Sequence, residues 1–164
     1  MHTQLIAPNF VFEMEKANID SLQGYLIPQV AKTLRQITIM MNAKLLENGS
    51  NLTKSQLILM RHLENGSKPQ STLAIATDRD KGSLTRLVQS LEKKDYVKRH
   101  NCPNDSRVNM VELTSKGNEI LNKTMPLVKN LFGKLQSEIS SEEKEITLKV
   151  LKEIEKNAIT AMAH

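Results

Sequence analysis

The sequence is poor in the residues that mark several large classes of protein. It has no tryptophan, two tyrosines and three phenylalanines, so leucine, isoleucine, valine and methionine must fill its core. Its single cysteine, Cys102, excludes an intrachain disulfide and favours a cytoplasmic protein. No apolar run approaches the roughly 20 residues of a membrane span, and the N-terminus lacks the basic start of a signal peptide. We therefore expect no membrane partner.

Motifs of catalysis are also missing. The sequence has no glycine-rich phosphate-binding loop, no metalloprotease motif and no credible pair of nucleophile and base. Its histidines are scattered, without the spacing of metal ligands: His2, His62, His100 and His164. The sequence therefore predicts neither an enzyme nor a protein that holds a metal or another cofactor.

A modest excess of positive charge is present, and one segment carries most of it. The chain has 164 residues and a formal net charge of +5, which is compatible with one domain and with a nucleic-acid partner. Residues 79–107 contain eight basic and four acidic side chains. This segment is the first candidate for a binding surface.

Residues 81–94 have the pattern of a helix with one buried stripe. The apolar side chains follow the i, i+3, i+4, i+7 spacing, at Leu84, Leu87, Val88 and Leu91. Asp80 is a plausible N-cap. The opposite face lacks carboxylates and holds Gly82, Arg86, Gln89 and Lys93, flanked by Ser83, Thr85 and Ser90. Such a face suits the major groove of DNA, although an ordinary solvated basic face would have the same pattern.

A β-hairpin is expected directly after this helix. Tyr96–His100 and Val108–Leu113 are rich in β-formers, with Val97, Val111 and Leu113 as the inward residues. Residues 101–107 between them form a turn-rich tip that ends in Arg107. An arginine on such a tip suits the minor groove, whose negative potential attracts it. Helix, hairpin and basic tip in this order favour DNA over the plain alternative.

Two short helices are expected before the basic helix. Thr53 and Gln56 form a capping box that opens the first. Residues 69–76 form the second, and residues 77–80 turn into the basic helix. The sequence thus predicts a mainly α fold with a small β-hairpin wing: a winged helix-turn-helix.

Long apolar stripes are expected on helices at both ends of the chain. One helical pattern runs from about Asp20 to Glu47, but Gly24 and Pro28 weaken its first turns, so the helix either kinks there or begins near Pro28. Another helix runs from the wing to about Ile139, with Pro126 bending it. Ser140 and Glu143 form a capping box that opens a last helix. These helices could pack on each other within one subunit. We favour their pairing with a second copy, because a DNA-binding part this small reads only a few base pairs alone.

A two-fold homodimer would set two recognition helices roughly 34–36 Å apart on a palindromic double-stranded DNA operator. We expect one domain overall with three parts. Residues 1–50 form an N-terminal arm and dimerisation helix, residues 51–116 the winged helix-turn-helix, and residues 117–164 the C-terminal dimerisation helices.

With these motifs in order, the chain resembles the MarR family of bacterial winged-helix transcription regulators over roughly residues 22–158. The resemblance lies in a series of short matches: Leu73-Ala74, residues 80–88 (DKGSLTRLV), residues 91–94 (LEKK), Val97 with Arg99, Asp105 with Arg107, and Leu113-Thr114 with Gly117. The resemblance implies a homodimeric transcription regulator, more often a repressor, that a small aromatic or anionic effector releases from DNA. The residues that bind this effector stay unassigned.

The resemblance also implies roles for particular residues. Ser83, Thr85 and Arg86 would touch DNA, and Arg107 would enter the minor groove with Asp105 supporting it by a salt bridge. The whole set of expected DNA-binding residues is Gln70, Ser71, Lys81, Gly82, Ser83, Thr85, Arg86, Gln89 and Arg107.

The chain departs from the family pattern at a few positions. Asp95 stands where the family usually has glycine, although aspartate tolerates the left-handed conformation better than most residues. Lys68-Pro69 replaces the usual Ser/Thr capping start of the next helix, which would weaken a phosphate contact there. Residues 21–25 lack the cysteine with which one branch senses peroxides. A redox switch at Cys102 is a separate hypothesis, and a harmless exposed thiol is the alternative.

One function of another class fits the same fold. A winged helix can serve protein assembly without specific DNA binding. The basic face of residues 81–94 and the arginine at position 107 argue against it, and DNA affinity measured against salt would separate the two functions.

Overall fold

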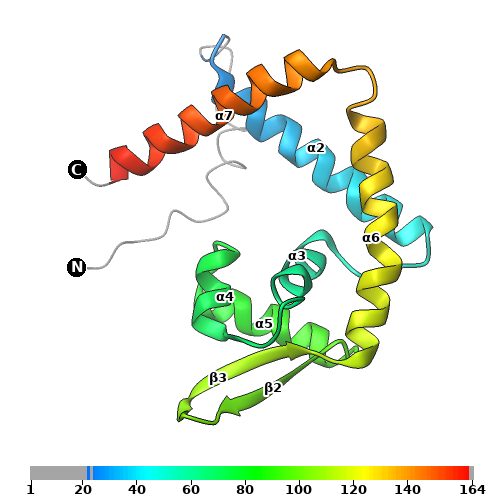
Figure 1. Cartoon of the computed structure of the whole chain (residues 1–164), viewed down its shortest axis with the longest axis vertical. Coiled ribbons are helices and arrows are strands. Elements are labelled where there is room, and N and C mark those ends of the chain that lie inside the picture. The colour runs from blue at the N-terminus through cyan, green and yellow to red at the C-terminus, as the bar shows by residue number, and fades with distance from the viewer. Residues whose placement is uncertain (1–21, 23, 163–164) are drawn as a thin grey trace. The chain divides into compact units, whose positions relative to one another are not determined.

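The computed structural model describes residues 22 and 24–162, which fall into two compact units that meet between Met125 and Pro126. The expected N-terminal arm lies outside the described residues. The fold is mainly helical with one small antiparallel sheet, as predicted (Figure 1). The elements in chain order are α2 (Leu26–Glu47), α3 (Lys54–His62), β1 (Lys68–Pro69), α4 (Gln70–Ala76), α5 (Lys81–Glu92), β2 (Val97–Cys102), β3 (Asp105–Leu113), α6 (Ser115–Leu135) and α7 (Ser141–Met162).

Two helices are shorter than their apolar patterns suggested. Helix α2 begins at Leu26, after Gly24 with a φ of +92°, which agrees with the expected start near Pro28 and not with a start near Asp20. Pro28 then lies in the first turn, where a missing N–H breaks no helical hydrogen bond. Helix α6 ends at Leu135 rather than Ile139, and it contains Pro126.

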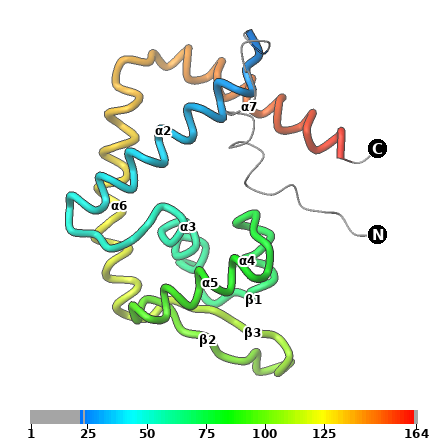
Figure 2. Tube along the Cα trace, turned by 180° about the vertical axis from the view of Figure 1, so that it is seen from behind, coloured from blue at the N-terminus to red at the C-terminus, as the bar shows by residue number. Residues whose placement is uncertain are grey.

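The first unit contains the helix-turn-helix and the sheet. Helices α3, α4 and α5 contact one another, and α4 and α5 contact the β2–β3 hairpin, as both views show (Figures 1 and 2). Their apolar stripes meet in a core from which water is almost excluded. That core includes Leu57, Leu59, Met60, Leu63, Leu73, Leu84, Val88, Leu91, Val97 and Val111. Val97 and Val111 are thus inward as predicted, whereas Leu113 is half-buried.

The sheet differs from the expected hairpin in having a third strand. Residues Lys68 and Pro69 form β1, which pairs with β3 opposite Val111 and Met110, so the strand order is β1-β3-β2. Strand β1 tolerates a proline because it lies at the edge of the sheet. No strand of the described residues pairs with its outer side, so the N–H that proline lacks is not needed for a hydrogen bond there.

The hairpin tip is also shorter than expected. The strands continue to Cys102 and from Asp105, so only Pro103 and Asn104 form the turn. The pairing jumps from Asn101 opposite Asn109 to Cys102 opposite Asp105. Residues 106–108 of β3 therefore lie in an irregular, bulged part of the ladder, although residues 106 and 107 were expected in the loop of the tip.

Three helix ends in the first unit close in the same way. At each, a residue with positive φ follows the helix, and two backbone N–H groups bond back to the last turn, which is the Schellman arrangement. The residues are Gly49 (φ 72°), Asp78 (φ 49°) and Asp95 (φ 60°). Asp95 thus adopts the left-handed conformation, as its place in the sequence predicted. The path from α5 into the wing keeps the same closure without glycine.

A buried glutamine joins the start of α3 to the end of α5. The Thr53–Gln56 capping box is present as predicted. Gln56 Oε1 accepts from the N–H of Thr53 and from Lys94 Nζ, each at 3.0 Å, and Gln56 Nε2 donates to Ser90 Oγ at 2.9 Å. Ser90 therefore points into this network rather than out toward the DNA face. Partial burial lowers the pKa of the Lys94 ammonium group.

We expect Gln56→Leu to lower the free energy of unfolding by about 1–3 kcal/mol, because it removes three hydrogen bonds of a buried side chain, those to the Thr53 N–H, Lys94 and Ser90, at nearly constant volume. Chemical denaturation would measure the change. Gln29→Leu is the matched control, since the exposed Gln29 side chain bonds only Thr33 among the described residues. Its cost should stay within about 0.5 kcal/mol. Equal effects of the two variants would contradict the role given to Gln56.

The second unit contains the end of α6 and the whole of α7. The predicted capping box opens α7: the N–H of Ser140 donates to Glu143 Oε2 at 2.8 Å, and the N–H of Glu143 donates to Ser140 Oγ at 3.2 Å. The Ser140 hydroxyl also bonds this carboxylate and, together with the backbone bond, lowers the pKa of Glu143. No residue of α7 is buried. Its large exposed apolar side chains are Ile146, Leu148, Val150, Leu151, Ile159 and Met162.

Candidate DNA-binding surface

Helix α5 has the two faces that its sequence predicted. Leu84, Val88 and Leu91 are buried, which fixes the helix on the core and turns the opposite side to solvent. On the solvent side Lys81, Gly82, Arg86 and Gln89 are exposed, and Ser83 and Thr85 are half-buried. Six of the nine predicted DNA-binding residues therefore share one helix and its outward side.

The start of α5 is capped as expected. The N–H of Ser83 donates to Asp80 Oδ1 at 2.8 Å. This backbone bond holds the pKa of the Asp80 carboxyl below its usual value, and the Arg86 charge adds to the effect. A Cβ on Gly82 would lie 3.2 Å from Asp80 Oδ1 and would meet nothing else within 4 Å. Glycine at position 82 thus leaves the Asp80 cap undisturbed. It also lets another molecule come close to the outer side of α5 at this point.

This cap should make stability depend on pH. A carboxyl whose pKa is lowered in the folded state stabilises it above the ordinary aspartate pKa of about 3.9, and that contribution disappears as the pH falls through the lower folded-state pKa. Asparagine caps helices about as well but does not titrate. We therefore expect wild type to lose more thermal stability than Asp80→Asn between about pH 7 and about pH 2, by scanning calorimetry. If the thermal stabilities of wild type and Asp80→Asn fall equally as the pH is lowered, the Asp80 carboxyl does not stabilise the fold in this way.

The N-terminus of α4 supplies two more predicted residues. Gln70 is half-buried and Ser71 is exposed, both in the first turn of this seven-residue helix. Pro69 occupies the N-cap position and makes no side-chain capping bond, as the departure of Lys68-Pro69 from the family pattern implied. The pairing of β1 with β3 holds this helix start instead.

The wing carries the last predicted residue, Arg107, in the bulged part of β3. Its side chain is exposed. Asp105 supports it through the backbone: Asp105 Oδ1 accepts from the N–H of Arg107 at 3.0 Å. No ion pair joins the two side chains in the described structure, so the support differs in kind from the salt bridge that the resemblance implied. The carboxylate shapes the tip, and the guanidinium stays available.

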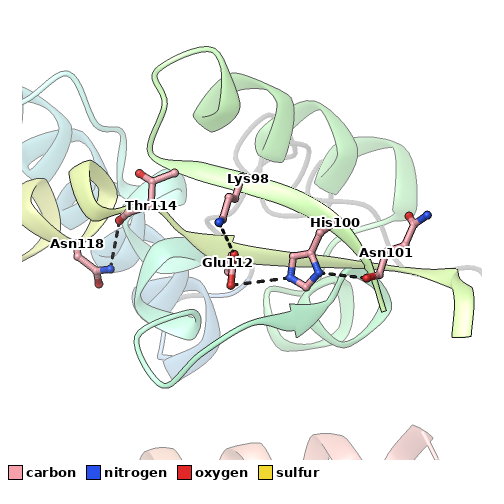
Figure 3. A network of polar contacts seen from close by, with 6 residues as sticks. All are labelled: Lys98, His100, Asn101, Glu112, Thr114 and Asn118. Carbon is pink, nitrogen blue, oxygen red and sulfur yellow. Dashed lines mark hydrogen bonds and ion pairs between the residues drawn. The ribbon is translucent and has the colours of Figure 1, made fainter. Parts of the chain in front are cut away.

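Ion pairs stabilise the base of the wing. Arg99 makes two bonds to Glu92 at the end of α5, from Nε at 2.9 Å and from a terminal nitrogen at 2.7 Å. On the other face of the hairpin Lys98 Nζ lies 2.8 Å from Glu112 Oε1, and His100 Nε2 lies 3.9 Å from the other carboxylate oxygen (Figure 3). The Lys98 hydrogen bond raises the pKa of Lys98 and lowers that of Glu112. The Arg99 pair links the hairpin to α5, whereas the contacts of Glu112 join the two strands of the hairpin.

One arginine near the site was missed from the sequence. Arg79 donates to Ser83 Oγ at 3.0 Å and to Ser55 Oγ at 2.8 Å. The sequence places Arg79 in the basic segment of residues 79–107 but predicts no role for it. Its place one residue before the N-cap of α5 is a local signal, but its second partner lies 24 residues away in sequence on α3, and only the fold reveals that contact.

Other kinds of site find little support in the described part of the chain. No group of three or more His, Cys, Asp or Glu residues there is placed to hold a metal ion. The helices of residues 22 and 24–162 include no candidate for a membrane span. Cys102 is a free, half-buried thiol at the end of β2.

Known proteins share both the sequence and the fold. A model of the MarR family matches residues 52–108. The transcriptional repressor MprA of Escherichia coli (strain K12) is 32% identical over 135 residues, which are 74% of this chain and 77% of MprA. The HTH-type transcriptional regulator MhqR of Bacillus subtilis (strain 168) is 29% identical over 130 residues, covering 79% of this chain and 88% of MhqR.

Solved structures agree on the fold. The transcriptional regulator BldR from Sulfolobus solfataricus has a TM-score of 0.72 at 24% identity, over 85% of this chain and 96% of BldR. A mutant of MarR from E. coli, solved in complex with operator DNA, has a TM-score of 0.71 at 21% identity, over 89% of this chain and 96% of MarR. The match to MprA over three quarters of both chains, together with the winged helix-turn-helix itself, establishes that the chain belongs to the MarR family of transcriptional regulators.

Proposed function

We propose that the chain is a sequence-specific repressor that binds a palindromic double-stranded DNA operator as a homodimer in the cytoplasm. The observation that carries the proposal is the outward side of α5, where Arg86 and Gln89 are exposed on a rigidly packed and capped helix. Both side chains can make two hydrogen bonds to one base edge in the major groove. Lys81, Ser83 and Thr85 lie on the same side, and Gln70, Ser71 and Arg107 would contact the backbone and the minor groove.

A homodimer is supported by apolar side chains that the single chain leaves exposed. At helical spacing these are Leu26, Val30 and Leu34 on α2, with Ile27 beside them, and Leu148, Leu151, Ile159 and Met162 on α7. Such stripes at helical spacing are usually covered by another apolar surface. We propose that a second copy covers them, which would place residues 1–50 and 117–164 in dimerisation and residues 51–116 in DNA binding.

Release from DNA is the remaining part of the proposal. A small aromatic or anionic effector would bind one state of the dimer better than the other and so weaken the affinity for the operator. Linkage of this kind typically amounts to about 1–3 kcal/mol, or roughly 5- to 150-fold in affinity. No enzymatic step and no cofactor is needed for it.

The test is fluorescence anisotropy with labelled DNA from upstream of the chain's own gene and with scrambled DNA, across a salt series. We expect selective binding whose affinity falls steeply as salt rises, because phosphate contacts release counterions. Sedimentation of the complex should give two chains per duplex. Weak binding equal for all sequences would contradict a specific operator in that region. Binding absent even at low salt would favour the alternative, a winged-helix module for protein assembly.

A further inference from the structure

The turn between α4 and α5 holds Arg79 in a fixed place. Asp78 adopts a left-handed conformation with φ of 49°. Its N–H donates to the carbonyl of Ile75 at 3.2 Å, and the N–H of Arg79 donates to the carbonyl of Ala74 at 2.9 Å. These two bonds are the Schellman closure of α4. The backbone of Arg79 is therefore part of a helix end rather than of a free loop.

From this turn the half-buried Arg79 side chain joins two helices. One terminal nitrogen donates to Ser83 Oγ on α5 at 3.0 Å, and the other donates to Ser55 Oγ on α3 at 2.8 Å. No carboxylate lies within ion-pair distance of this guanidinium in the described structure, although acidic residues flank it in sequence. The two serine hydroxyls are thus its observed partners.

The chemistry of arginine fixes the polarity of the bond to Ser83. A guanidinium only donates, so Ser83 Oγ accepts and its own O–H must point elsewhere. That O–H makes no hydrogen bond to any other described residue. Thr85 is the opposite case, because its hydroxyl donates to the carbonyl of Lys81 at 2.7 Å and keeps only lone pairs for a ligand.

We propose that Arg79 is a positioning residue that makes Ser83 a hydrogen-bond donor toward an acceptor on a DNA base edge. The inference rests on the proposed DNA-binding function and deepens it. In the major groove the acceptors are N7 of either purine, O6 of guanine and O4 of thymine. Arg79 then sets which base pair is preferred at one operator position without touching that base pair.

The test begins with selection of preferred sequences from a randomised duplex library by the full-length protein, followed by anisotropy on single-base-pair variants. Ser83→Ala should lose the preference at one position, about three- to tenfold for one hydrogen bond. Arg79→Gln should lose the preference at that same position. The double variant should bind no worse than Ser83→Ala, because both changes remove one interaction.

Two further variants separate positioning from loss of charge and from loss of fold. Ser55→Ala removes the anchor on α3 without changing any charge, and should weaken the same preference with an unchanged salt dependence. Arg79→Lys keeps a donor-only side chain and should retain part of the preference. Lys123→Gln, at an exposed position of α6, removes one positive charge and should leave the preference intact.

Contrary results are clear. If Arg79→Gln weakens binding equally for all sequences and lowers the salt slope by about one phosphate contact, Arg79 binds DNA itself and the proposal is wrong. Additive losses in the double variant would also overturn it. If the wild type selects no sequence at all, the proposed function itself fails. If the wild type is selective and the Arg79 and Ser55 variants keep that selectivity, the positioning role alone fails.

Discussion

Alanine at position 117 should destabilise the protein by about 3 kcal/mol or more, among the largest effects of any single methyl group in this chain. A Cβ there would lie 1.9 Å from the carbonyl oxygen of Tyr96 and 2.9 Å from its carbonyl carbon. Both contacts are with backbone, so no side-chain rotation relieves them. Either α6 or the start of β2 must move.

The surrounding hydrogen bonds make that movement costly. The N–H of Thr114 donates to the same Tyr96 carbonyl at 3.1 Å, and Thr114 Oγ1 donates to the carbonyl of Asp95 at 2.7 Å. The N–H of Gly117 donates to Thr114 Oγ1 at 2.9 Å, which caps α6. A shift large enough for a methyl group would strain all three bonds and would pull at the left-handed residue that ends α5.

Gly133→Ala is the matched control in the same helix. A Cβ at Gly133 meets nothing within 4 Å, so alanine should raise helix stability by about 0.5–1 kcal/mol. Urea denaturation of both variants would measure the difference. A midpoint for Gly117→Ala close to that of wild type would mean that α6 does not pack on Tyr96 as described.

The sequence predicted those parts of the fold that short-range chemistry decides. Thr53 with Gln56, Asp80, and Ser140 with Glu143 all cap helices as expected, because a cap needs only residues three positions apart. The apolar stripe of α5 likewise predicted which side of this helix is buried. Strand β1 escaped prediction because Lys68-Pro69 has no periodicity. Its strand character comes from pairing with β3, a non-local contact.

In the candidate site, too, the features set by local spacing were predictable and those set by the fold were not. The residues on α5 follow from helical spacing alone, so their common outward side was predictable. The contact of Asp105 with the backbone of Arg107, and that of Arg79 with Ser55, depend on where a bulge or a turn places a side chain. The first is a local bond between residues two positions apart, but only the bulge decides that it forms, and the second joins residues 24 positions apart. Residue types therefore predicted the surface, while the partners of its charged groups needed the fold.

Arg86→Ala should have the largest effect on DNA affinity. Arg86 is exposed on α5 and makes no hydrogen bond or ion pair to another described residue, so its guanidinium is available for a base edge. A bidentate contact to guanine is worth about 1–3 kcal/mol, and a homodimer would lose it twice, or about 2–6 kcal/mol per operator. The loss should also relax the preference at one base pair in each half-site.

Arg107→Ala is the informative comparison, because the arginine of the wing would meet the minor groove, where the pattern of base edges is degenerate. Its loss should weaken binding with less change in major-groove preference. Anisotropy on an operator and on duplexes changed at single positions, with each variant at several salt concentrations, would separate the two. Equal losses on all duplexes for Arg86→Ala would reduce its role to a phosphate contact. Unchanged affinity for both variants would remove Arg86 and Arg107 from the DNA interface and contradict the proposed mode of binding.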